Sequence, residues 1–218
     1  MGFALVNSAK SAASTQPALT LDTTGANLLI AHVCAAVNGG PTISDSRGNT
    51  WTALTSENGT SEFMSSWYCV PSSVGTGHTI TTASGSSMFA SLYVSAWSGA
   101  SATPFDKQAG ATLATRPGSI TPAANGCLVI SGLCSHTAGT YAVDSGFTIA
   151  QQQTFVSGTN DGGAQAYLIQ TTAAALNPTW SGGSTCSVNI VSFLPGAAAG
   201  ALAPSAFVRQ AVNRASTY

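Results

Sequence analysis

Apolar and polar positions follow β-strand periods along almost the whole chain. Within residues 91–100 (SLYVSAWSGA), Leu92, Val94 and Ala96 alternate with residues of the opposite face, which is the period of a strand. Residues 27–36 (NLLIAHVCAA) are almost continuously apolar, as in a strand that is buried on both faces. Gly, Asn and Pro separate such runs. We therefore expect an all-β protein, in which only residues 207–212 have helical spacing.

The strand pattern occurs twice. Residues 91–100 match residues 187–197 (SVNIVSFLPGA) at a shift of 97, and residues 28–34 (LLIAHVC) match residues 128–134 (LVISGLC) at a shift of 100. An internal repeat is therefore predicted over about residues 25–100 and 125–197. Either half alone would expose an apolar face. We thus expect residues 1–196 to form one jelly-roll-like, two-sheet antiparallel β-sandwich built from two similar halves.

Two segments lie outside the repeat. Residues 101–122 are punctuated by Pro and Gly, which predicts a connection with a strand only at residues 111–114. Residues 197–218 are predicted to be a flexible linker followed by an extended or short-helical C-terminal arm, AFVRQAVNRASTY. The apolar and basic residues of this arm are the candidate partner-binding residues: Phe207, Val208, Arg209, Val212, Arg214 and Tyr218.

The composition limits the possible partners. Charged residues make up 6% of the chain, against roughly 25% in ordinary globular domains, and the net charge is -1. Near-zero charge favours self-association, so we expect a homo-oligomer. Six basic residues are too few to neutralise a run of phosphates, which argues against nucleic acid. We also expect no membrane span and no secretory signal, and hence assembly in a cytoplasm.

The titratable residues suggest no catalytic, metal or cofactor site. The five cysteines form no CxxC motif, so buried free thiols are expected, although disulfide pairing stays open. Asp45 and Asp144 head similar turns, where an Asp side chain caps its own backbone. Glu57 and Glu62 flank a predicted Asn-Gly hairpin and are expected to be solvated. His32 lies on a strand face and is expected to be partly buried and hydrogen-bonded.

The four tryptophans leave one alternative open. Trp67 and Trp97 lie in strand patterns and are expected in the core, as is Trp51. Trp180 stands beside SGGS, and the face of an exposed Trp can stack on a sugar ring. A glycan-binding surface built on Trp180 and Trp51 is therefore the alternative to a purely structural role.

Several segments together carry a family resemblance: GANLLIAHV, ISDSRGNTWTAL, YVSAWSGA before PFD, NGCLVISGL, DSGFTIAQQ and NIVSFLPGA. They resemble a β-sandwich module of tailed-bacteriophage virion proteins that also occurs in some bacterial surface proteins. The resemblance covers about residues 25–197. It implies a capsid decoration protein, a fibre or a tail-decorating protein, and it supplies no catalytic residues.

From the resemblance we expect a non-enzymatic structural protein of a bacteriophage particle, located in the virion. The favoured role is a capsid decoration or cement protein that docks on the capsid lattice. Its partners would be the major capsid protein or another virion protein, and copies of itself. The alternative is a tail or fibre adhesin that binds glycans. A small β-sandwich hydrolase ranks third, since it would need two carboxylates that converge in a cleft.

Overall fold

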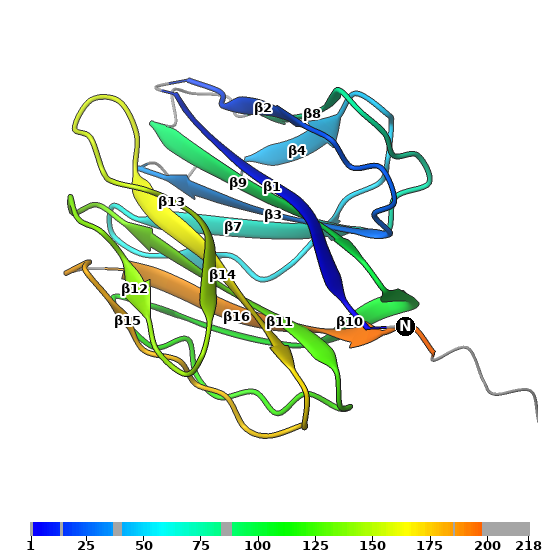
Figure 1. Cartoon of the computed structure of the whole chain (residues 1–218). Helices are drawn as coiled ribbons and strands as arrows, with labels where there is room; N and C mark the ends of the chain where they lie inside the picture. Colours follow the sequence, from blue (N-terminus) through cyan, green and yellow to red (C-terminus); the bar gives the residue numbers. More distant parts are fainter. Residues whose placement is uncertain (1, 14, 37–40, 84–88, 185, 198–218) are drawn as a thin grey trace, which may run out of the picture.

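The computed structural model describes residues 2–13, 15–36, 41–83, 89–184 and 186–197. These residues form two large and two small antiparallel sheets, and no helix occurs among them. Figure 1 shows the first half of the chain, in blue to green, packed on the second half, in green to orange. The prediction of an all-β antiparallel sandwich built from two similar halves is therefore confirmed.

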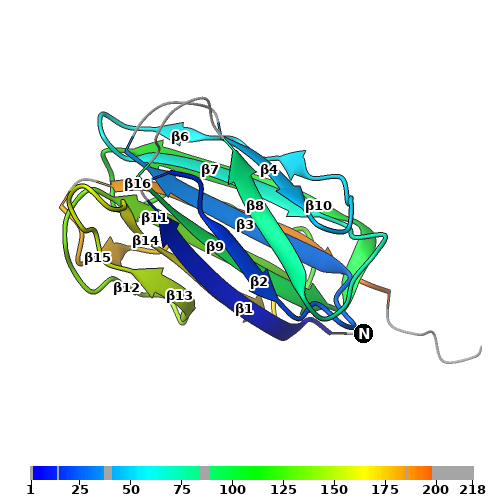
Figure 2. The ribbon, with the colours of Figure 1, turned by 90° about the horizontal axis from the view of Figure 1, so that it is seen from above.

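The first half forms one large sheet, sheet A, and a small sheet that covers it. The strands of sheet A, in the order β1-β9-β3-β7-β5 with β6 beside β7, are β1 (Ala4–Ala13), β3 (Leu28–Ala35), β5 (Thr52–Ala53), β6 (Glu57–Asn58), β7 (Phe63–Cys69) and β9 (Ala90–Ser98). The small sheet, in the order β2-β8-β4, contains β2 (Ala18–Leu21), β4 (Thr42–Asp45) and β8 (His78–Ala83). In Figure 2 this small sheet lies over sheet A.

The second half repeats this plan. Its large sheet, sheet B, has the order β10-β16-β11-β14-β13 and contains β10 (Ala100–Thr112), β11 (Cys127–Ser135), β13 (Thr148–Gln153), β14 (Gly162–Gln170) and β16 (Cys186–Pro195). A two-stranded sheet of β12 (Ala142–Val143) and β15 (Trp180–Ser181) lies beside it. The strand order of sheet B therefore matches that of sheet A, position by position.

The strand registers correct the predicted alignment of the halves by one residue. Leu28 pairs with Trp97 in sheet A, and Leu128 pairs with Phe193 in sheet B. The central strands β3 and β11 thus correspond at a shift of 100, as expected. The strands β9 and β16, however, correspond at a shift of 96 (193 minus 97), not 97. Trp97 is therefore equivalent to Phe193, and both side chains are fully buried in the same layer.

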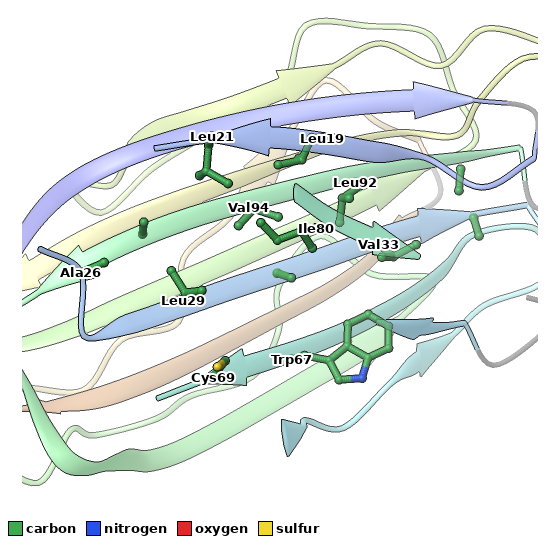
Figure 3. Packing of buried hydrophobic residues seen from close by; sticks show 14 residues of the cluster. Leu19, Leu21, Ala26, Leu29, Val33, Trp67, Cys69, Ile80, Leu92 and Val94 are labelled. Atoms are coloured by element: carbon green, nitrogen blue, oxygen red, sulfur yellow. The ribbon is translucent and has the colours of Figure 1, made fainter. Parts of the chain in front are cut away.

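Apolar side chains fill three layers. The central layer lies between the large sheets and contains Leu28 and Ile30 of β3 with Leu128 and Ile130 of β11. The alternate residues of each large sheet face outward and pack beneath the small sheet of their own half. Figure 3 shows this for the first half, where side chains from β2 and β8 lie over those of β3 and β9. Both faces of the central strands are buried, which accounts for their continuous apolar sequences.

Two strands extend further than the sequence predicts. The connection expected at residues 101–122 is largely β10, which pairs with β16 along the edge of sheet B. Most of its side chains are at least partly exposed, and an edge strand of this kind needs no apolar alternation, so the pattern gave no signal. β1 likewise continues through residues 10–13 (KSAA), which show no apolar alternation, and pairs there with β9.

The boundary between the halves is a close backbone contact. Gly99 has a φ of 90°, in the left-handed region that favours glycine, and a Cβ there would overlap the carbonyl oxygen of Gly2. The amide of Gly196 donates to the carbonyl of Gly99 at 2.7 Å. The N-terminal residues and the last described residues therefore meet at one end of the sandwich (Figure 1).

Candidate functional site

The predicted partner-binding residues lie outside the described part of the chain. This holds for Phe207, Val208, Arg209, Val212, Arg214 and Tyr218. The structure does locate the point from which their segment starts. Gly196 is held against Gly99, so the described chain ends at the same end of the sandwich as the boundary between the halves.

Trp180 and Trp51 do not form the alternative glycan platform. The exposed fraction of Trp180 is 1%, and its Nε1 donates to Ser131 Oγ at 2.9 Å, so neither face of its ring is free for a sugar. Trp51 is half-buried and donates to Asp45 at 2.8 Å. The two residues also pack in opposite outer layers of the molecule. Trp67 and Trp97 are buried in the core, as predicted.

The acidic residues behave only partly as expected. The Asp45 carboxylate accepts the amide of Arg47 at 2.8 Å, which is the predicted turn role. Asp144 accepts the amide of Thr179 at 2.7 Å, so it ties its turn to the chain before β15. Glu57 and Glu62 are buried rather than solvated, because the hairpin that carries them folds against the edge of sheet B.

His32 lies at the centre of the molecule without a hydrogen-bond partner among the described residues. It is fully buried, and neither ring nitrogen is paired, so the expectation of a partly buried, hydrogen-bonded side chain is wrong. Burial lowers the pKa of His32 to about 3. The ring fits because the facing residue is Gly132, where a Cβ would lie 2.7 Å from the ring atoms Cε1 and Nδ1.

The cysteines are free and buried, as expected. Cys34 and Cys134 occupy equivalent positions of β3 and β11, and they cluster with Met64 and Tyr93 between the large sheets. Burial raises the pKa of Cys134, so its thiol is protonated. Among the described residues no group of three or more His, Cys, Asp and Glu side chains is placed to hold a metal ion.

A His–Asp pair lies at the end of the sandwich opposite the contact of Gly2, Gly99 and Gly196. β11 and β14 are neighbours, and Ser135 at the end of β11 pairs with Gly162 at the start of β14. The residues just beyond this pair, His136 and Asp161, therefore meet, with Nδ1 of His136 2.7 Å from Oδ1 of Asp161. The Asp161 side chain is fully buried, whereas 41% of the His136 side chain is exposed.

The surroundings of Asp161 disfavour its charged form. Burial raises the pKa of Asp161 to about 7, the nearby Glu62 adds to this rise, and the hydrogen bond from His136 opposes it. The Sγ atom of Cys134 lies 3.9 Å from Oδ2. A strongly perturbed carboxyl beside a pocket is typical of functional sites.

A pocket of about 290 Å³ opens at this pair. Its walls include Phe89, Phe155, Val156 and Asn160. The ring centroids of Phe155 and His136 are 4.2 Å apart. Phe89 has a φ of 47°, which is a strained conformation for a bulky residue, and its carbonyl accepts the amide of Asp161 at 2.6 Å.

Sequence reasoning missed this pocket. His136 and Asp161 are 25 residues apart and belong to no short motif, so only the pairing of β11 with β14 brings them together. Only the positions of these residues along the chain could have indicated the site: His136 directly follows the buried strand β11, and Asp161 directly precedes β14.

A second, shallower groove of about 310 Å³ lies on the seam between the halves. The rings of Tyr68 and Phe105 stack there, with centroids 6.0 Å apart and planes 14° apart, and Thr50 and Thr52 line one wall. Residues 102–104 also line the groove, and they belong to a bulge in the β10–β16 pairing between Ala100 and Phe105. Such bulges re-aim side chains and are over-represented beside binding sites.

Comparisons with known proteins found no matching family model, no matching curated protein and no matching solved structure. Within the described ranges, no helix is long and apolar enough to span a membrane.

Proposed function

We propose that the protein is a non-enzymatic structural component of a bacteriophage particle and that it decorates the capsid. The observation that supports this role is the origin of the C-terminal segment. Residues 198–218 begin at a point fixed by the Gly196–Gly99 hydrogen bond, and they contain the apolar and basic residues expected to dock on a neighbour. The sequence resemblance supplies the phage context of the proposal.

In this mechanism the sandwich is a rigid body and the segment after residue 197 is its tether. Many copies on a repetitive lattice would add their weak contacts through multivalency. The low content of charged residues, 6% of the chain, suits this arrangement, because few like charges would oppose the packing of identical copies.

The test is removal of residues 198–218, followed by binding of the purified protein to particles that lack it. We expect the truncated chain to lose at least about tenfold in affinity, as one contact per copy is removed. A control chain carrying a scrambled 198–218 segment should be as weak. Binding of the truncated chain at full affinity would contradict the docking role of the segment.

A glycan-binding adhesin is the second candidate, and the groove at Tyr68 and Phe105 favours it. Phe105 is 38% exposed, so part of its ring is available to a sugar, and the Thr hydroxyls beside it can hydrogen-bond sugar hydroxyls. Phe105→Ala should abolish any glycan-array signal. Leu113→Ala, at an exposed apolar position outside the groove, should leave it intact. An array signal equal in both variants would exclude this groove.

A further inference from the structure

The His136–Asp161 pair is not explained by stability. A buried ion pair often stabilises a protein no more than apolar side chains of the same size. Here the carboxylate is fully buried while its partner is 41% exposed, so the pair carries a desolvation cost at the edge of a pocket. A buried carboxylate that holds a histidine in this way fixes the orientation and the tautomer of the ring.

The orientation leaves one ring nitrogen for a ligand. Above pH 7 Asp161 is ionised, so Nδ1 of His136 carries the ring proton and donates to Oδ1 at 2.7 Å. Nε2 then has a free lone pair and accepts a hydrogen bond. The ring of Phe155 packs against the His136 ring, with the two centroids 4.2 Å apart, and limits the rotation of the imidazole. The pair therefore presents a positioned hydrogen-bond acceptor at the pocket.

The other walls of the pocket limit the chemistry of the part of the ligand that carries the hydrogen-bond donor. Phe89, Phe155 and Val156 are apolar, and Val156 is 43% exposed. The Oδ1 atom of the buried Asn160 has no hydrogen-bond partner among the described residues. Apolar walls do not compensate the desolvation of a charged ligand. A volume of about 290 Å³ is at the lower limit for small-molecule sites.

We propose that this pocket binds a small, uncharged, hydroxyl-bearing aromatic ligand. The aromatic ring packs between Phe89 and Phe155, and the hydroxyl donates to Nε2 of His136. Asp161 acts as a positioning residue, since its fully buried carboxyl group holds Nδ1 of His136 and leaves Nε2 of that ring to meet the hydroxyl. This site lies at the opposite end of the sandwich from residues 196 and 197, where the described chain ends (Figure 1), and none of its residues belongs to the proposed docking segment.

The test compares two probes that differ by one hydroxyl, p-cresol and toluene, by NMR titration of the full chain at about pH 8, where Asp161 is ionised. We expect p-cresol to bind at least about fivefold more tightly than toluene, the ratio that one net hydrogen bond supplies. His136→Phe should bring this ratio to about one while toluene still binds. Phe155→Ala should weaken both probes roughly tenfold, since it removes a ring that the ligand buries. Phe105→Ala, in the other groove, is the matched control and should change neither.

Each other result overturns the proposal. It fails if neither probe saturates, if both bind equally to the wild-type chain, or if Phe105→Ala removes binding. It also fails if a methyl pyranoside binds more tightly than p-cresol, because the site would then select a sugar. Should His136→Phe not fold, His136→Met is measured instead, since its flexible apolar side chain can fill the space and its thioether is only a weak acceptor.

Discussion

His32 is a neutral imidazole in the middle of the molecule, and its environment makes protonation costly. Gly132 supplies the space, but no described residue supplies a hydrogen bond to either ring nitrogen. The pKa falls from 6.5 to about 3 because burial penalises the charged form. The unfolded chain therefore binds a proton below pH 6.5 that the folded chain does not bind, and stability decreases as the pH falls through this window.

We predict that His32→Met removes this acid sensitivity. Methionine is apolar, flexible and does not titrate, so it can occupy the site without the proton linkage. Urea unfolding at pH 7.5, 5.5 and 4.5 should show the wild-type chain losing about 1.4 kcal/mol per pH unit below 6.5 relative to the variant.

The comparison must use the difference between the two chains at each pH. The raised pKa of Asp161 acts with the opposite sign, lowering stability as the pH rises from about 4 to 7, and it cancels in that difference. Parallel pH profiles of wild type and variant would contradict the role given to His32.

At the scale of strands, the predictable parts were those with a repeating apolar pattern. β3, β9, β11 and β16 could be located because both of their faces are buried and apolar residues predominate in their sequences. β10 could not, because an edge strand with exposed side chains has no such pattern. The candidate site escaped for a related reason: strand register brings His136 to Asp161, and register depends on tertiary pairing rather than on local sequence.

The contact between β3 and β11, where Gly132 faces the His32 ring, gives a prediction at the scale of strands. Gly132→Ala would place a Cβ 2.7 Å from the His32 ring and 2.8 Å from Asn189 Oδ1, so it should cost about 1–3 kcal/mol through overpacking. In a His32→Ala background the cost should be smaller by about 1 kcal/mol or more, because the ring clash is gone and only Asn189 remains. Denaturant unfolding of the four chains measures this coupling, and additive costs would show that the two strands do not meet through this pair.

At the scale of the whole molecule, each half supplies one large sheet and the central layer needs both. Leu28, Ile30 and Trp97 of the first half are fully buried against Leu128 and Phe193 of the second. A separated half would expose this layer to water, and burial of such side chains contributes about 1.5–3 kcal/mol each.

We therefore predict that residues 1–99 alone self-associate or aggregate, whereas co-expressed 1–99 and 100–197 form a soluble one-to-one complex. Size-exclusion chromatography with light scattering distinguishes these outcomes. A monomeric, cooperatively folded 1–99 fragment would show instead that the halves are independent domains.

The meeting of Gly2, Gly99 and Gly196 has a topological consequence. The chain starts, crosses from one half to the other and leaves the sandwich at a single corner. A short link from residue 197 to residue 2, combined with a cut at Gly99, would yield a circular permutant in which the second half precedes the first. We expect this permutant to reach the same packed structure, so that the order in which the ribosome delivers the two halves is not a requirement of the fold.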